Sequence, residues 1–178
     1  MTSAGPGVLR TYDPNIRADI MGEPSSVRAH VYGLAASCHV VKLSDEDAAW
    51  IGEDAGLSPA EVLQRIGDSG PRFAVLTTGE HGCLPIVDGR THQLPARPVE
   101  LVDTIGAGDA FMSGLICALA KGGLAELLLD DATAGELPEH QVISALETAL
   151  ASASVAVSRA GAQPPTINEL HQLIVDTV

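Results

Sequence analysis

The chain contains few cysteines, and few positive charges relative to negative ones, and both shortages narrow its possible functions. Its three cysteines, Cys38, Cys83 and Cys117, are isolated from one another and have neither zinc-ligand spacing nor the pattern of a disulfide framework. The 10 basic residues are outnumbered by 23 acidic ones, and the formal net charge of −13 argues against nucleic-acid binding. The six histidines are dispersed, so we expect them to be surface or packing residues rather than metal ligands.

Long hydrophobic runs and two common nucleotide-binding motifs are also absent. The longest apolar run, around Ala110–Ala120, is too short to cross a bilayer, and no signal-peptide pattern precedes Val8. Together with the isolated cysteines, these absences predict a cytoplasmic protein that has no membrane partner. The sequence has no G-x-x-x-x-G-K-[S/T], which excludes a P-loop NTPase. It also has no G-x-G-x-x-G after its first expected strand, which disfavours a dinucleotide-binding Rossmann domain.

Apolar segments separated by turn signals predict an α/β fold. With 178 residues, 46% of them hydrophobic and only 3% aromatic, the chain can bury one core of closely packed aliphatic side chains, and we expect a single domain over residues 1–178. The order of elements favours a three-layer α/β/α sandwich with a mostly parallel sheet. Expected strands are residues 8–12, 38–43 and 73–77, with a hairpin formed by 82–87 and 90–94 across Asp88 and Gly89. Expected helices are residues 23–36, 44–51, 58–69, 109–120, 121–131, 139–157 and 166–178.

One stretch carries the strongest functional signal: residues 103–109, with the sequence DTIGAGD, followed by an apolar helix. Gly106, Ala107 and Gly108 predict a turn of small residues whose backbone amides lie at the helix N-terminus, where they can bind an anion. A carboxylate beside an anion site repels the ligand, so Asp109 is better explained as a base that takes a proton from a nucleophile attacking that anion. A lone G-x-G-D would more simply be a tight turn with a favourable acid at the helix start.

The match to a known signature is longer than that tetrapeptide. Residues 103–109, with Gly114 in the following helix, resemble the second signature of the PfkB (ribokinase-like) carbohydrate kinases. The resemblance implies a ribokinase-like fold and transfer of the γ-phosphoryl group from Mg-ATP to a sugar hydroxyl. Asp109 would be the catalytic base in contact with the sugar, and the Gly106–Gly108 turn would be an anion hole that also contacts ATP.

Two further segments suggest contacts to the substrate and to magnesium. Pro14 ends the first expected strand, so Asn15 and Arg17 are expected on a loop at its C-terminal end, where open parallel sheets bind ligands. The sequence DPNIR resembles the fructokinase branch, which favours a fructose-like sugar and makes Asn15 and Arg17 candidate substrate contacts. Ser44 and Asp47 have near capping-box spacing, which explains them structurally. The family has an Asn-x-x-Glu motif here, and by that match Asp47 would hold Mg²⁺ through a water molecule.

The resemblance also implies sites for ATP and for a potassium-type monovalent cation. Thr77, Gly79 and Gly82 follow the third expected strand; they would lie along the nucleotide, although glycines there can simply shape the turn into the hairpin. The cation would be held by the carboxylate of Asp103 and by the backbone carbonyls of Ile105, Ala156, Arg159 and Gly161. Pro165 stands where a ribokinase has a serine ligand, so one contact of that site is missing.

The resemblance covers essentially the whole chain, but the chain does not cover the whole family fold. The N-terminal part of the family, with its Gly-Gly sugar motif and its β lid, has no counterpart here. The first strand is therefore expected to leave an exposed sheet edge, which invites a homodimer or a completing partner chain. A mis-assigned start codon, a fragment and a shortened paralogue all remain open as explanations. The alternative to an active sugar kinase is a catalytically silent remnant that binds a nucleotide or a partner.

Overall fold

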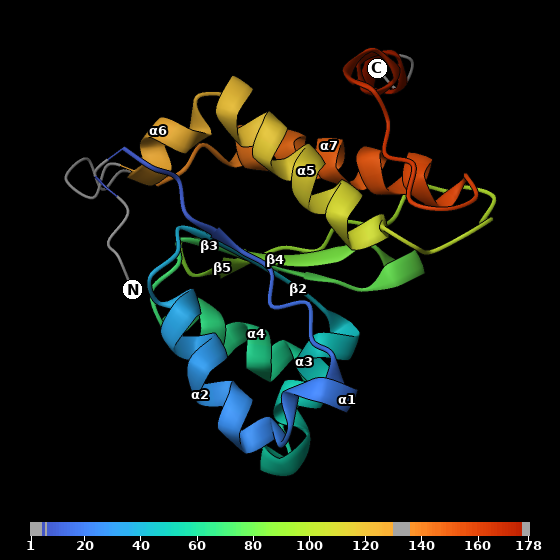
Figure 1. Cartoon of the computed structure of the whole chain (residues 1–178). Coiled ribbons are helices and arrows are strands. Elements are labelled where there is room, and N and C mark those ends of the chain that lie inside the picture. The colour runs from blue at the N-terminus through green and yellow to red at the C-terminus, as the bar shows by residue number, and fades with distance from the viewer. Residues whose placement is uncertain (1–4, 6, 130–135, 176–178) are drawn as a thin grey trace. The chain divides into compact units, whose positions relative to one another are not determined.

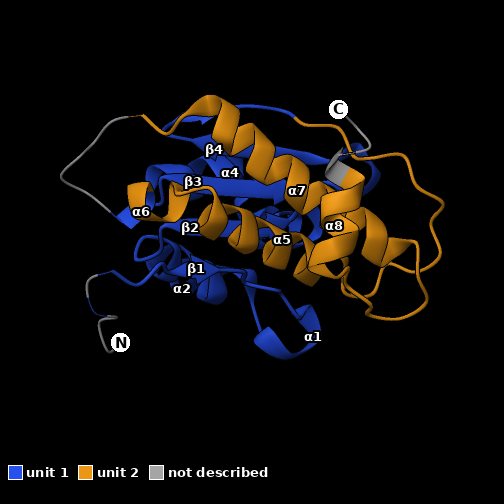
Figure 2. Cartoon of the chain, turned by 90° about the horizontal axis from the view of Figure 1, so that it is seen from above, with its two compact units in different colours: residues 1–93, 128–134 blue, residues 94–127, 135–178 orange. Residues whose placement is uncertain are grey.

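The computed structural model describes residue 5 and residues 7–129 and 136–175 (Figure 1). The chain forms two compact units, coloured separately in Figure 2. Unit 1 comprises residues 1–93 and 128–134, and unit 2 comprises residues 94–127 and 135–178. Within the described parts of both units, no helix is long and apolar enough to cross a membrane.

Unit 1 contains a five-stranded mixed sheet with strand order β1-β2-β3-β4-β5. Its strands are β1 (Thr11–Tyr12), β2 (Val40–Ser44), β3 (Phe73–Thr77), β4 (Cys83–Val87) and β5 (Arg90–Thr91). The first three strands are parallel, and β3, β4 and β5 pair antiparallel in turn. The predicted hairpin is confirmed: Asp88 and Gly89 connect β4 to β5 with φ values of 46° and 77°, as a two-residue hairpin turn with left-handed central residues requires.

The sequence located the central strands better than the outer ones. β3 has the predicted bounds, and β2 lies within two residues of them. β1 and β5 are each only two residues long, shorter than the predicted 8–12 and 90–94. An edge strand ends where its single partner stops pairing, and β1 pairs with β2 only at Thr11 and Tyr12. A propensity pattern cannot show that limit.

Three helices cover one face of this sheet, as Figure 1 shows for α2, α3 and α4. The helical segments of unit 1 are α1 (Ala18–Met21), α2 (Pro24–Ala35), α3 (Asp45–Gly52), η1 (Glu53–Ala55), α4 (Pro59–Asp68) and η2 (Gly79–His81). The three long ones were predicted; α1 and the two 3₁₀ turns were not. Ser44 is the N-cap of α3 and Ser58 is the N-cap of α4, each with a complete capping box, so both predicted N-termini are confirmed.

The core of unit 1 follows from the alternation of side chains along the strands. Val41 and Leu43 of β2 enter a fully buried cluster, which also contains Ile51, Leu63 and Ile66 of the covering helices. Each such side chain contributes about 1.5–3 kcal/mol when it leaves water. The first four residues of β2 and of β3 are all buried, a pattern typical of strands that are covered on both faces.

Unit 2 is built mainly from two long helices that run side by side (Figure 2). Its elements are α5 (Ala107–Lys121), α7 (Glu139–Val157) and α8 (Ile167–Val175), while α6 (Leu124–Leu129) contains the boundary between the units. A Cβ on Gly114 of α5 would lie 2.7 Å from the Cβ of Ser152 and 3.1 Å from the Cα of Ala149, so only glycine permits this close helix contact.

The helices of unit 2 agree with the sequence predictions except at some ends. α7 has the predicted bounds, whereas α5 begins at Ala107, two residues before the predicted Asp109. The predicted end of the helix over 121–131, and the last residues of the predicted helix over 166–178, lie outside the described residues.

Candidate active site

In unit 2, the predicted monovalent-cation site is centred on Asp103, whose carboxylate joins two distant segments of the chain. Its Oδ1 accepts a hydrogen bond from the Ile105 amide at 3.0 Å, and its Oδ2 accepts one from the Gly161 amide at 2.8 Å. These bonds stabilise the charged form, so the amides of Ile105 and then Gly161 lower the pKa of Asp103. The loop before α5 is thereby tied to the turn that follows α7.

Backbone bonds bring the remaining predicted cation-site residues to the same place. The amides of Val102 and Asp103 both donate to the Val157 carbonyl, at 2.8 and 3.1 Å. The Arg159 amide donates to the Ala156 carbonyl at 3.2 Å, so the end of α7 turns back beside the loop. Unit 2 therefore brings together all five predicted residues, which are Asp103, Ile105, Ala156, Arg159 and Gly161.

An ion pair fixes the turn after α7 to the start of α8. The Arg159 guanidinium pairs with Glu169, which also accepts from the Thr166 amide at 2.7 Å and from the Thr166 hydroxyl at 2.9 Å. The Thr166 amide, followed by Arg159, lowers the pKa of Glu169 to about 2. The Arg159 side chain thus has a structural partner, and only its backbone carbonyl is left for the predicted cation role.

The small-residue turn has the backbone conformation that an anion-binding helix start needs. Gly106 precedes α5 with φ of 78°, in the left-handed region that favours glycine. A Cβ there would also lie 3.0 Å from the Cβ of Ala162, so both conformation and space demand glycine. The Ala107 amide donates to the Thr104 carbonyl at 3.2 Å, and the Ala110 amide donates to the Gly106 carbonyl at 2.9 Å. The amides at the start of α5 that can donate to a ligand are therefore those of Gly108 and Asp109.

Asp109 lies in the first turn of α5, and its side chain is exposed. Among the described residues, none makes a hydrogen bond or ion pair with its carboxylate. A carboxylate that neither caps its helix nor neutralises a cation remains available to accept a proton. Its role as the catalytic base stays a prediction.

In unit 1, the predicted substrate residues lie on the loop that joins β1 to α1. Arg17 donates from Nη1 to the Asn15 side-chain oxygen at 2.7 Å, and both residues are exposed. Asn15 has φ of 44°, a left-handed conformation that asparagine tolerates better than most residues. The Ile16 amide between them donates to Oδ1 of Asp47 at 2.8 Å. The structure therefore brings Asn15 and Arg17 close to Asp47.

The carboxylate of Asp47 already has structural partners. Its Oδ2 accepts from the Ser44 amide at 3.1 Å, and its own amide donates to the Ser44 hydroxyl at 3.0 Å, which completes the predicted capping box. Asp47 is only 8% exposed. Each carboxylate oxygen keeps a second lone pair, so contact with a metal-bound water is compatible with these bonds.

Thr77, Gly79 and Gly82 all lie at the turn between β3 and β4. Gly79 and Gly82 have φ values of 55° and 95°, so the turn itself requires both glycines. Within the turn, the Thr78 amide donates to the Gly82 carbonyl at 2.8 Å. The hydroxyl of Thr77 lies 3.4 Å from the Leu43 carbonyl on the neighbouring strand. The geometric explanation of these glycines is thus sufficient, and their predicted nucleotide contacts stay a prediction.

The predicted residues divide between the units. Unit 1 holds Asn15, Arg17, Asp47, Thr77, Gly79 and Gly82. Unit 2 holds Asp103, Ile105, Gly106, Ala107, Gly108, Asp109, Ala156, Arg159 and Gly161. Sequence reasoning missed Lys42, a buried lysine in β2 that pairs with Asp13. Its signal was a single charge inside the apolar run VVKLS.

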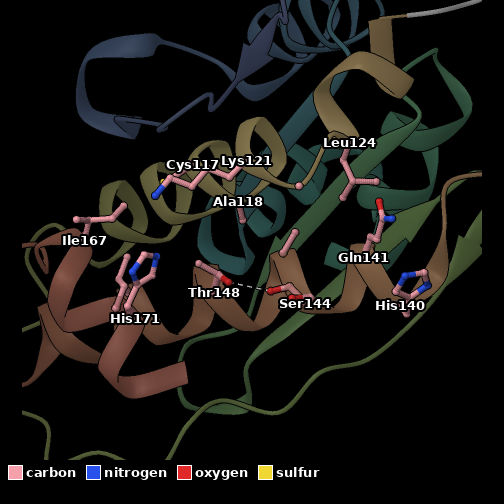
Figure 3. A pocket seen from close by; sticks show the side chains of 13 residues that line it. Cys117, Ala118, Lys121, Leu124, His140, Gln141, Ser144, Thr148, Ile167 and His171 are labelled. Carbon is pink, nitrogen blue, oxygen red and sulfur yellow. Dashed lines mark hydrogen bonds between the residues drawn. The ribbon is translucent and has the colours of Figure 1, made fainter. Parts of the chain in front are cut away.

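A cavity of about 300 Å³ in unit 2 lies elsewhere, between α5, α7 and α8 (Figure 3). Lys121 of α5 and His171 of α8 stand on its opposite walls, and Cys117 lies beside them. None of the predicted catalytic, nucleotide or cation residues lines it. No group of three or more His, Cys, Asp and Glu side chains that could hold a metal ion occurs among the described residues of either unit.

Residues 7–169 match the family model described as pfkB family carbohydrate kinase. The chain therefore belongs to the PfkB family of carbohydrate kinases.

Relatives agree with this family. A fructokinase from Klebsiella pneumoniae is 36% identical over 148 residues, which cover 83% of this chain and 47% of that protein. Fructokinase-2 from Zea mays is 29% identical over 170 residues, which cover 94% of this chain and 48% of that protein. This chain thus spans about half the length of the curated relatives it matches.

Solved structures confirm the ribokinase-like α/β fold. A fructokinase from Xylella fastidiosa with bound ATP superposes with a TM-score of 0.77 at 22% identity, over 96% of this chain and 53% of that one. A fructokinase from Vibrio cholerae O395 with fructose, ADP and calcium ion superposes with a TM-score of 0.69 at 27% identity, over 91% of this chain and 49% of that one.

Proposed function

We propose that the chain is the nucleotide-binding part of an ATP-dependent sugar kinase that transfers the γ-phosphoryl group of Mg-ATP to a hydroxyl of a fructose-like sugar. The observation that carries this proposal is Asp109, exposed and without a described partner, in the first turn of a helix that begins with the Gly106–Gly108 turn. A family match that spans residues 7–169, and so includes most of both units, supports treating the chain as one PfkB-type domain.

The proposed mechanism assigns each step to residues of this chain. Asp109 accepts the proton of the sugar hydroxyl as that oxygen attacks the γ-phosphorus, and the bond between the γ-phosphorus and the bridging oxygen breaks so that ADP leaves. The Gly106–Gly108 turn and its amides stabilise the negative charge on the transferring phosphoryl group. Thr77, Gly79 and Gly82 contact the nucleotide, and Asn15 and Arg17 orient the sugar so that its hydroxyl is in line for attack.

The donor groups present fit the two cations that the family implies. Both oxygens of Asp47 retain a lone pair for a magnesium-bound water, and Mg²⁺ commonly keeps several waters beside one or two carboxylates. For the monovalent cation, Asp103 and nearby backbone carbonyls offer oxygen ligands where the loop before α5 is hydrogen-bonded to the turn after α7. A double-mutant fructokinase from Vibrio cholerae O395 has been solved with fructose, ADP and potassium ion, which supports a potassium-type site here. Bound Mg²⁺ would neutralise phosphate charge during transfer.

The outer edge of β1 supports a further proposal about partners. β1 pairs with β2 on one side and ends the described sheet on the other. A free edge is a template for another strand, so a second copy or a completing chain would pair there. Sedimentation or light scattering tests this: a dimer at micromolar concentration is expected, and a monomer at all concentrations would contradict self-pairing.

A coupled assay of ADP release by the 178-residue protein tests the function, with Mg-ATP, potassium and a panel of sugars that includes fructose. Sugar-dependent turnover is expected. Because the chain spans only about half of its relatives, a silent nucleotide-binding remnant is the second candidate. ATP binding by calorimetry without ADP release for any sugar would favour that candidate over the kinase.

A further inference from the structure

Lys42 is an unusual residue for its position. It lies in the middle of β2, between Val41 and Leu43, and its side chain is only 6% exposed. Burying an ammonium group is costly unless the charge is paired. Its Nζ donates to Oδ2 of Asp13 at 3.0 Å, so the pairing comes from the loop that follows β1.

The parallel register explains why Asp13 is the partner. Thr11 lies opposite Val40 and Tyr12 opposite Val41, so the next residue of each strand brings Asp13 beside Lys42. Oδ1 of Asp13 is also buried, and it accepts no hydrogen bond from the described residues. Asp13 is therefore held by one strong contact, and loss of Lys42 would leave a partly buried carboxylate without compensation.

A second tie holds the same loop three residues later. Oδ1 of Asp47, at the start of α3, accepts the Ile16 amide at 2.8 Å. Between the two ties, Pro14 is buried and Asn15 adopts φ of 44°. The loop is thus attached on both sides of its left-handed residue, by one side chain from β2 and one from α3.

We propose that Lys42 is a positioning residue: its ion pair with Asp13, together with the Asp47–Ile16 bond, holds the loop so that Asn15 and Arg17 are presented to the substrate. This inference rests on the proposed sugar-contacting role of Asn15 and Arg17. A loop that is ordered before binding loses less conformational entropy when the ligand arrives. The ion pair therefore acts on sugar affinity without touching the sugar.

A purely structural ion pair would have different consequences. In that case removing Lys42 would lower the stability of unit 1 as a whole, and affinity for the sugar would stay unchanged in the folded protein. Local order of the loop and sugar affinity therefore separate the two roles, whereas a loss of stability alone does not.

Hydrogen–deuterium exchange of the full 178-residue chain tests the local effect without any assumption about activity. Lys42→Met should make amides of residues 13–22 exchange about tenfold faster while α4 (Pro59–Asp68) keeps its protection. Lys121→Met, at an exposed lysine in the last turn of α5, is the control and should leave the loop unchanged. Unchanged exchange over 13–22 in Lys42→Met would overturn the proposal.

Asp13→Asn offers a second route if Lys42→Met folds poorly, because it keeps the side-chain shape and removes the charge. The two single variants and the double variant form a cycle in which the effects on loop exchange should be clearly less than additive. Additive effects would show that Lys42 and Asp13 act on the loop independently, which contradicts the proposal that their ion pair holds the loop.

Sugar kinetics provide the functional test. In Lys42→Met, the KM for the sugar should rise about tenfold while the KM for ATP changes less than about twofold. A loosened loop with an unchanged sugar KM would overturn the positioning role. If the wild-type chain shows no turnover with any sugar, the proposed function fails, and the exchange measurements still decide whether Lys42 holds the loop.

Discussion

The two units hold their candidate functional residues by different means. In unit 1, buried or half-buried charged side chains tie a surface loop to the sheet and to α3, as Lys42 and Asp47 do for the loop of Asn15 and Arg17. In unit 2, Asp109 stands on a long helix whose position depends on close backbone contact at Gly114. A loop held by a few polar contacts can be adjusted or loosened locally, whereas a residue on a tightly packed helix moves only if the helix moves.

Two aspartates show the same contrast in detail. Asp47 and Asp103 each accept one backbone amide on each carboxylate oxygen. Asp47 caps its own helix and is almost fully buried, while Asp103 joins segments 58 residues apart and is only half-buried. A carboxylate that accepts two backbone amides therefore stabilises the start of a helix in unit 1 and holds two distant segments together in unit 2.

The largest expected effect comes from the catalytic assignment in unit 2. Asp109→Asn should lower turnover about a thousandfold with little change in the KM for ATP, because it removes a base but leaves the glycine turn intact. Glu46→Gln, an exposed acid in the first turn of α3, is the matched control and should retain activity. Retained turnover in Asp109→Asn, measured by coupled ADP release, would exclude Asp109 as the base.

Glycine replacements test the packing difference between the units. Gly114→Ala should destabilise the protein by about 1–3 kcal/mol, because its Cβ would meet Ser152 and the backbone of α7. Gly33→Ala in α2 is the matched change and should stabilise by about 0.4–1 kcal/mol, since nothing lies within 4 Å of its added Cβ. Urea unfolding measures both, and equal effects would contradict the close contact of α5 with α7.

The smallest expected effect is a pH dependence at the start of α8. Glu169 has a pKa of about 2, below its ordinary value of 4.5, so the charged form is favoured by folding. The contribution of the Glu169 carboxylate to the free energy of unfolding is complete above the ordinary pKa. This contribution is lost as the pH falls toward the pKa that Glu169 has in the folded protein. The difference in melting temperature between wild type and Glu169→Gln should therefore be constant near neutral pH and shrink below about pH 4.5.

Glu61→Gln is the control for that measurement. Glu61 has the same capping-box role at α4, with its pKa lowered by Ser58, but no ion pair with an arginine is recorded for it among the described residues. The change with pH in the melting-temperature difference between wild type and Glu61→Gln should be smaller than the corresponding change for Glu169→Gln. A difference for Glu169→Gln that persists unchanged to about pH 2 would show that the Arg159 and Thr166 contacts do not stabilise the charged carboxylate.

Much of the fold could be predicted because its signals are local. The long helix α7 and the strand β3 have the predicted bounds, since Pro138 precedes the one and Gly70-Pro71 interrupts the chain before the other. The four-residue helix α1 was missed because so short a segment carries no periodic pattern. The family could likewise be inferred from contiguous residues, because the DTIGAGD motif needs no tertiary information to be read.

The sequence by itself determined the order of the strands and long helices, the helix caps at Ser44 and Ser58, and the small-residue turn beside Asp109. Only the tertiary structure decided that Lys42 pairs with Asp13, that Asp47 binds the Ile16 amide, and that Asp103 binds the Gly161 amide. Caps and turns depend on neighbours a few residues away, which the sequence shows directly. These three contacts join residues 29, 31 and 58 positions apart, and their partners become neighbours only when strands pair in register and loops close.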